Sequence, residues 1–193
     1  KNPAFYFLSE MAFDYENTWY SAENKNWPDF RKGFYDEDSL NDFKDHYKQK
    51  DLDFFVDPGY MRAWCHGSPG IGLSRVGAVE VLEGKYLSDL KNAVESTRES
   101  LKPFGGYHPT YTLCHGIGGN GLLLLEAMPH LKDDDFYQDL NDAADKAIEQ
   151  FEEQGFYTCG LAMHKGSGDT SLFMGDAGIG YFLLANHTKY RET

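Results

Sequence analysis

Basic residues are scarce in this chain of 193 residues. Lysine and arginine number 18 against 31 aspartate and glutamate residues, so the formal net charge is −13. A protein that coats nucleic acid needs a lysine- or arginine-rich face to neutralise phosphates. No such face could offset this acidity, and the composition therefore excludes a nucleic-acid partner of that kind.

Long hydrophobic runs are also missing. No stretch approaches the about 18 uninterrupted apolar residues that indicate a membrane-spanning helix. The first residues, Lys1-Asn2-Pro3-Ala4, show no signal-peptide pattern. Hydrophobic residues still make up 41% of the chain and aromatic residues 16%, which is enough to build a core. We expect a single domain over residues 1–193, without a membrane span and located in the cytoplasm.

Cysteine is rare and widely spaced. The chain has three cysteines, Cys65, Cys114 and Cys159. An odd number at such distances argues against a disulfide framework. A reducing compartment, with thiols available for metal binding or catalysis, fits this pattern better.

Glycine, by contrast, is abundant and marks an internal repeat. Three segments align without gaps and share the pattern Gly-x-x-Gly-x-Gly, at residues 66–73, 115–122 and 174–181. A phosphate-binding loop is an alternative explanation of these glycines. No Gly-Lys-Ser/Thr follows and the spacing is not Gly-x-Gly-x-x-Gly, so tight packing of helices is the better interpretation for most of them.

The periodicity of the remaining chain predicts helices. An apolar run follows each glycine segment, and polar segments with helical stripes of apolar residues lie between them, at residues 87–101 and 136–151. No strand-like alternation of convincing length accompanies them. Each repeat therefore predicts an apolar inner helix and an amphipathic outer helix, which must stack on neighbouring repeats to bury both faces. The expected fold is all-α, a ring or solenoid of αα-hairpins.

The first part of the chain is less regular. We expect an aromatic-rich helix over residues 3–20, a loop over residues 24–33, and a second helix over residues 39–48 that starts at a serine cap, Ser39. The many aromatic side chains near the N-terminus suit core packing, although they could also cover an edge of the fold or bind peptide.

Two of the repeats begin with a cysteine–histidine pair. Cys65-His66 comes directly before the first glycine of one repeat, Gly67, and Cys114-His115 before that of the next, Gly116. Stacked repeats would bring both pairs to one rim, and thiolate and imidazole are ligands that Zn²⁺ prefers. Taken alone, the pattern leaves open a second interpretation, in which the cysteines are buried and the histidines hydrogen-bonded. Cys159 has no such partner and is expected to be a small buried hydrophobe.

Four segments carry a more specific signal: Trp64-Cys65-His66-Gly67-Ser68-Pro69-Gly70, Leu113-Cys114-His115-Gly116, Asn26-Trp27-Pro28-Asp29, and residues 171–181. The first two resemble the zinc motifs of the LanC-like lanthionine cyclases, and the last resembles the final inner helix of that family. The third is similar to a segment of the C-terminal cyclase domain of class II lanthipeptide synthetases. The resemblance runs from about residue 15 to residue 185.

This resemblance implies part of an α/α toroid, corresponding to the C-terminal half of a cyclase domain. It also implies one zinc ion bound by Cys65, Cys114 and His115, with a fourth position left for water or a substrate thiol. The implied reaction adds a peptide cysteine thiol to dehydroalanine or dehydrobutyrine and forms a thioether ring. The implied partners are a dehydrated precursor peptide and the N-terminal cyclase and dehydratase portions.

Two further residues are candidates for catalysis. His66 is the best local proton donor for the enolate that thiol addition produces, or else a rim histidine that orients substrate and ligands. Arg62 could stabilise the enolate, although a solvated surface position suits it too. Two alternative functions stay open: a LanC-like protein that binds glutathione or another thiol, and a non-catalytic peptide-binding scaffold with a structural zinc.

Overall fold

A computed structural model describes most of the chain as helices. The described residues are 2–30, 37–51, 59–102, 110–133, 135–159 and 169–191. Within them the backbone forms seven helices and no strand, with only two isolated bridges, Ser21–Asn26 and Ala63–His66. The all-α prediction is confirmed. No helix of this part of the chain is long and apolar enough to cross a membrane.

The helices follow the order that the repeats predicted. They are α1 (Pro3–Asn17), α2 (Glu37–Gln49), α3 (Ser68–Val79), α4 (Leu87–Leu101), α5 (Ile117–Leu131), α6 (Asp135–Gln154) and α7 (Asp176–Arg191). Each glycine segment opens one of the odd-numbered helices from α3 to α7, and the two amphipathic stripes became α4 and α6.

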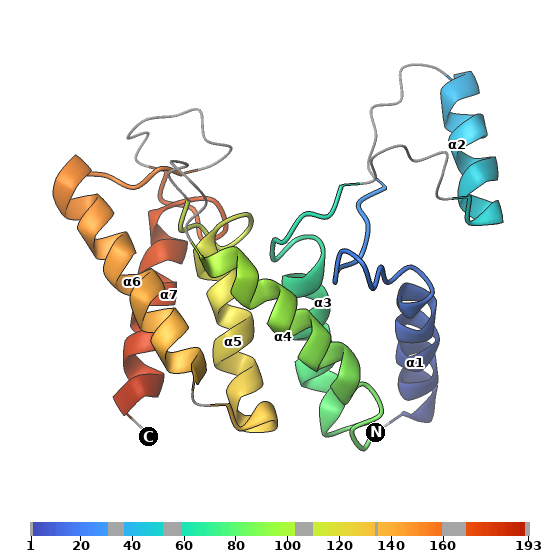
Figure 1. Cartoon of the computed structure of the whole chain (residues 1–193), viewed down its shortest axis with the longest axis horizontal. Helices are drawn as coiled ribbons and strands as arrows, with labels where there is room; N and C mark the ends of the chain where they lie inside the picture. The colour runs from blue at the N-terminus through green and yellow to red at the C-terminus, as the bar shows by residue number, and fades with distance from the viewer. Residues whose placement is uncertain are drawn as a thin grey trace.

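Inner and outer helices form two layers (Figure 1). Helix α5 lies between α3 and α7 and contacts both, while α4 packs on α3 and α5, and α6 packs on α5 and α7. Figure 1 shows these five helices as a row that runs from α3 in the centre to α6 and α7 at the left. Adjacent hairpins thus bury one another's faces, as the stacking argument requires. The complete toroid stays a prediction.

The core lies between the two layers. Helix α5 buries Leu123, Leu124 and Leu125 because it has neighbours on most sides. The amphipathic outer helices bury only the stripe that faces inward, represented by Leu90 on α4 and Leu140 on α6. This arrangement holds the starts of α3, α5 and α7 at fixed positions relative to one another.

The middle glycine of each repeat is needed for a close backbone approach. A Cβ on Gly70 would lie 2.3 Å from the carbonyl oxygen of Trp64, and a Cβ on Gly119 would lie 1.7 Å from that of Leu113. Gly178 has the same relation to Leu172, at 1.9 Å. Real side chains do not come so close, so glycine lets the loop before each inner helix fold back onto the first turn.

The N-terminal helices depart from the expectation in two respects. The prediction that the aromatic residues of the first helix pack in the core is wrong for α1, which buries none of its residues and leaves Phe5 and Phe7 exposed. Helix α2 begins at Glu37, so the prediction that it starts at a Ser39 cap is also wrong. Helix α1 is held by polar and ring contacts instead. The buried Arg75 of α3 pairs with Glu16 and lies over the Phe13 ring.

Candidate metal centre

The loops before the three inner helices are joined by backbone hydrogen bonds at equivalent positions. The N–H of Cys65 donates to the carbonyl of Cys114 at 3.4 Å, and the N–H of Cys114 donates to the carbonyl of Phe173 at 2.8 Å. These residues occupy the same place in their respective repeats. The hydrogen bonds therefore bring the two cysteines, 49 residues apart in the chain, to adjacent positions on one rim.

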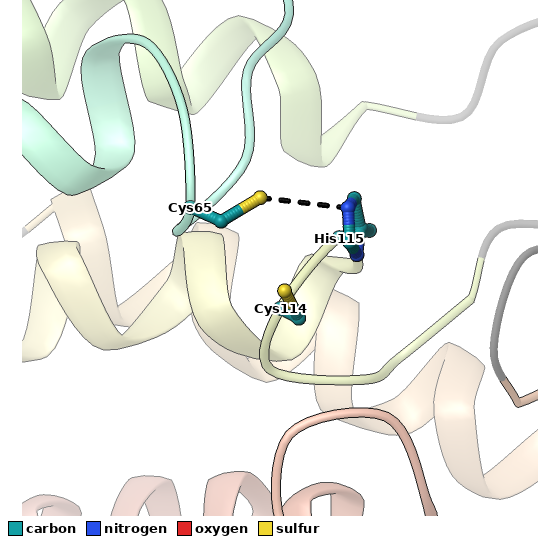
Figure 2. A group of neighbouring side chains, drawn as sticks. All are labelled: Cys65, Cys114 and His115. Atoms are coloured by element: carbon teal, nitrogen blue, oxygen red, sulfur yellow. Dashed lines mark hydrogen bonds between the residues drawn. The ribbon is translucent and has the colours of Figure 1, made fainter.

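Cys65, Cys114 and His115 form a cluster at this rim. One donor atom from each residue lies within 4.8 Å of the other two. The Sγ atom of Cys65 is 3.4 Å from Nε2 of His115. Figure 2 shows the Cys65 side chain turned toward the His115 ring, with Cys114 beside them on the loop before α5. All three cysteines of the chain are thiols, not disulfides.

The donor set fits a zinc ion. Two thiols and one imidazole are ligands of the kind that Zn²⁺ takes, and three protein ligands leave a fourth position for another group. Nδ1 of His115 is buried without a hydrogen-bond partner within the described residues. A buried nitrogen is rarely left without a partner in proteins. The His115 ring therefore has a nitrogen that a bound group could satisfy. Cys65 is exposed, which leaves the cluster accessible to a solute.

Asn26 holds the loop that carries Cys65, and the sequence assigned it no role. It is fully buried. Its Oδ1 atom accepts from the backbone N–H of Ser68 at 2.8 Å and from its hydroxyl at 2.6 Å, while its Nδ2 atom donates to the carbonyls of Tyr60 and Met61 at 3.0 and 3.1 Å. Asn26 thereby caps the start of α3, where Gly67 has no side chain to do so.

His66 lies next to Cys65 in sequence but faces a different loop. Its Nε2 atom is 3.2 Å from the carbonyl of Pro28 and 3.8 Å from a carboxylate oxygen of Asp29. The ring is therefore positioned by the Asn26–Asp29 loop, and it is not among the three clustered donors. Its role as a proton donor stays a prediction.

Arg62 is directed to helix α4. Its Nε atom donates to the hydroxyl of Ser96 at 2.9 Å, and a terminal nitrogen lies 3.5 Å from Glu99 and 3.3 Å from the carbonyl of Asn24. The backbone carbonyl of Arg62 accepts from Asn120 on α5 at 2.9 Å. These contacts tie the loop to two helices, and a catalytic role for the guanidinium stays a prediction.

Cys159 is separate from the cluster. Its side chain is buried in the core, as predicted, and its Sγ atom also donates to a carboxylate oxygen of Asp176 at 3.3 Å. Burial, and then the neighbouring Asp176 carboxylate, raise the pKa of this thiol to about 12. A thiol that stays protonated is a poor metal ligand and a poor nucleophile.

Comparison with known proteins places the chain in a family. The family model described as "Lanthionine synthetase C-like protein" matches residues 2–192. The chain belongs to this family of lanthionine synthetase C-like proteins.

One curated relative matches over a shorter segment. It is the lacticin 481/lactococcin biosynthesis protein LcnDR2 of Lactococcus lactis subsp. lactis, which is 35% identical over 75 residues. The match covers 36% of this chain and 8% of the length of that protein.

Proposed function

We propose that this chain is the zinc-binding portion of a lanthipeptide cyclase. The cluster of Cys65, Cys114 and His115 carries the proposal, because its donors suit Zn²⁺ and it lies on an accessible rim. Membership in the lanthionine synthetase C-like family and the likeness to a lacticin biosynthesis protein support the same function. We infer a cytoplasmic location, since three widely spaced cysteines that form no disulfide with one another suit a reducing compartment.

The proposed reaction joins two residues of a dehydrated precursor peptide. The sulfur of a cysteine forms a bond to Cβ of dehydroalanine or dehydrobutyrine, and the Cα–Cβ double bond becomes single. The thiol gives up its proton, and Cα gains one. A free thiol has a pKa of about 8.5 and is mostly protonated at neutral pH. Zinc held by Cys65, Cys114 and His115 would supply the positive charge that favours the thiolate of the substrate cysteine.

The surrounding residues would serve the other half of the addition. Attack at Cβ leaves negative charge on the enolate, and the N-termini of α3, α5 and α7 lie at the loops that form the rim. Their dipoles favour negative charge there. His66, held by the carbonyl of Pro28, is the nearest candidate in sequence to deliver the proton to Cα. Arg62 is a second candidate for stabilising the enolate.

The number of protein donors bears on the alternatives. A structural zinc is normally enclosed by four protein ligands, whereas a catalytic or thiol-binding zinc has three. His66, the obvious fourth ligand in sequence, makes its contacts with Pro28 and Asp29 instead. Among the residues that the structure describes, three donors thus meet, which favours a site that accepts a thiol over a closed structural site. Cyclisation and simple binding of glutathione are then distinguished by whether the thiol is consumed.

The first test measures metal content. Cys114→Ala removes one of the three donors and should reduce zinc bound after purification from near one ion per chain to a small fraction of that. Cys159→Ala is the matched control, since this thiol lies in the core beside Asp176 and should leave zinc content unchanged. Equal loss of zinc in both variants would contradict the proposed ligands.

The second test measures the reaction. Zinc-loaded protein is incubated with a dehydrated precursor peptide that contains a free cysteine, and the thiol is titrated over time. A cyclase should consume the thiol without changing the peptide's mass. A protein that only binds thiols should protect the cysteine reversibly, and release it intact on denaturation, which would contradict the cyclase proposal.

A further inference from the structure

An aromatic cavity of about 400 Å³ opens beside the cluster. All three tryptophans of the chain line it, and so do Phe30 and Tyr47. The rings brace one another, because Trp19 stacks on Tyr47 with ring centres 5.1 Å apart and meets Phe30 edge-on at 4.9 Å. Rigid rings of this kind make a preformed surface for an apolar group.

The cavity adjoins the candidate metal centre through one shared residue. Cys65 belongs both to the cavity lining and to the cluster of donors, and His66 lines the cavity next to it. A peptide whose sulfur lies at the cluster would therefore bring its adjacent residues to the mouth of the cavity. This step rests on the proposed function, since it takes the substrate to be a peptide thiol.

The charges around the cavity favour an apolar occupant over a cation. Glu16 is a carboxylate in the lining, but its oxygen lies 2.6 Å from the guanidinium of the fully buried Arg75. The ammonium of Lys50 already lies over the Trp19 ring, 5.6 Å from its centre. Glu16 is thus already paired with a cation, and the Trp19 ring already has a cation over it. The volume is in the range of sites for small ligands, about 300–1,000 Å³.

We propose that this cavity is a specificity pocket that binds a large apolar side chain, an aromatic ring above all, from the residue next to the substrate cysteine. The pocket would orient the peptide so that its sulfur reaches the cluster. It would also select among the cysteines of a precursor that carries several.

Tryptophan fluorescence tests the pocket directly, because every tryptophan of the chain lines it. The metal-free wild-type chain is titrated with capped, thiol-free pentapeptides Gly-Ser-X-Ser-Gly in which X is Phe, Ala or Lys, and binding is measured in parallel by calorimetry. The Phe peptide should bind saturably with a change in emission, and the Ala and Lys peptides should bind about tenfold more weakly or worse. Equal binding of all three, a preference for Lys, or no emission change and no heat with Phe would overturn the proposal.

A pair of variants locates the binding. Tyr47→Ala removes one wall and should weaken binding of the Phe peptide by about tenfold. Phe151→Ala removes an exposed ring from α6, which is outside the cavity, and should leave binding unchanged. Unchanged binding in Tyr47→Ala, with its helical content intact by circular dichroism, would overturn the assignment. If that variant does not fold, the peptide series on the wild-type chain decides alone.

The two proposals fail separately. The fluorescence titration uses neither zinc nor a thiol, so its failure rejects the pocket and leaves the cyclase proposal standing. If Cys114→Ala and Cys159→Ala lose zinc equally while the Phe peptide still binds saturably, the metal site is rejected and the pocket is kept.

Discussion

Asn26 is a single buried side chain on which the position of Cys65 depends. Its amide spans two parts of the same loop, because it accepts from Ser68 at the start of α3 and donates to the carbonyls of Tyr60 and Met61 before the cysteine. A hydrogen bond contributes only about 1 kcal/mol net, but buried groups left without partners are more costly. The amide therefore acts on both the stability of the fold and the geometry of the rim.

We expect Asn26→Ala to lower the free energy of unfolding by about 3 kcal/mol, because it leaves several buried backbone and hydroxyl groups without partners. Zinc affinity should fall about 10–100-fold as the Cys65 loop loosens. Urea denaturation and competition with a chelator measure the two effects. Asn186→Ala is the control, because this buried side chain on α7 donates a hydrogen bond to Asn141. The variant should lower the free energy of unfolding by about 1 kcal/mol and leave the zinc affinity unchanged.

At the scale of the elements, glycines decide how closely loops and inner helices approach. Gly119 on α5 faces the carbonyl of Leu113, the residue before Cys114. Gly180 on α7 has no atom of the described residues within 4 Å of the place where a Cβ would be. The two are the middle and last glycines of their repeats, so the same motif contains positions with opposite tolerance.

Gly119→Ala should lower the free energy of unfolding by at least about 3 kcal/mol, since backbone must move to admit the methyl group. Gly180→Ala should raise it by about 0.5–1 kcal/mol, because alanine is the better helix former and meets no obstacle. Chemical denaturation of both variants checks this. A neutral Gly119→Ala would mean that the loop before α5 does not pack against the helix as described.

The attachment of α1 depends on a buried arginine rather than on an apolar face. The guanidinium of Arg75 lies 2.6 Å from Glu16 of α1 and 3.3 Å from Asp89 of α4, and it stacks on the Phe13 ring at 3.9 Å. Asp89 is itself largely buried. Removing the cation would leave this carboxylate without its compensating charge.

Arg75→Met should therefore lower the free energy of unfolding by about 3–5 kcal/mol. Arg98→Met is the comparison, because Arg98 pairs with Asp139 between α4 and α6 but is partly exposed. This variant should lower the free energy of unfolding by about 1 kcal/mol or less. Thermal and urea unfolding of the two variants measure the difference. Similar losses would show that burial does not set the strength of the Arg75 pairs.

For the molecule as a whole, buried acids that stay protonated predict sensitivity to high pH. Burial raises the pKa of Tyr111 to about 12, with a smaller contribution from Glu149, and the pKa of Cys159 is also about 12. In an unfolded chain these groups titrate near 10 and 8.5, approximately. The folded state thus binds both protons more tightly, and the stability that this provides is complete below about pH 8 and declines as the pH rises toward 12.

We expect the urea midpoint to be flat between about pH 7 and 8, and to fall by an amount equivalent to about 3 kcal/mol from these two groups by about pH 10.5. The combined variant Tyr111→Phe and Cys159→Ala lacks both ionisable groups and should lose the part of the slope that they contribute, while other tyrosines with a raised pKa, Tyr47 among them, keep the rest. A wild-type midpoint that stays constant to pH 10.5 would contradict the burial of these side chains.

Much of the fold could be predicted from local sequence patterns. The glycine segments and the apolar stripes predicted the inner and outer helices within a few residues, because helical periodicity and the need to bury one face are properties of neighbouring residues. The helix at residues 3–20 was predicted, but not that α1 exposes its aromatic face, since that depends on which neighbours it meets. The start of α2 was misplaced because a serine is only one of several ways to begin a helix.

The chain alone determined which chemistry is present: two cysteine–histidine pairs, the repeat that relates them, and a resemblance specific enough to suggest zinc and a thiol substrate. The resemblance pointed to Cys65, Cys114 and His115, but only the tertiary structure decided that they meet, since their convergence depends on hydrogen bonds between loops far apart in sequence. It also assigned Asn26 its place, turned His66 toward Pro28, and gathered three tryptophans around one cavity. Contacts between distant segments are set by how whole helices pack, and no local pattern encodes that packing.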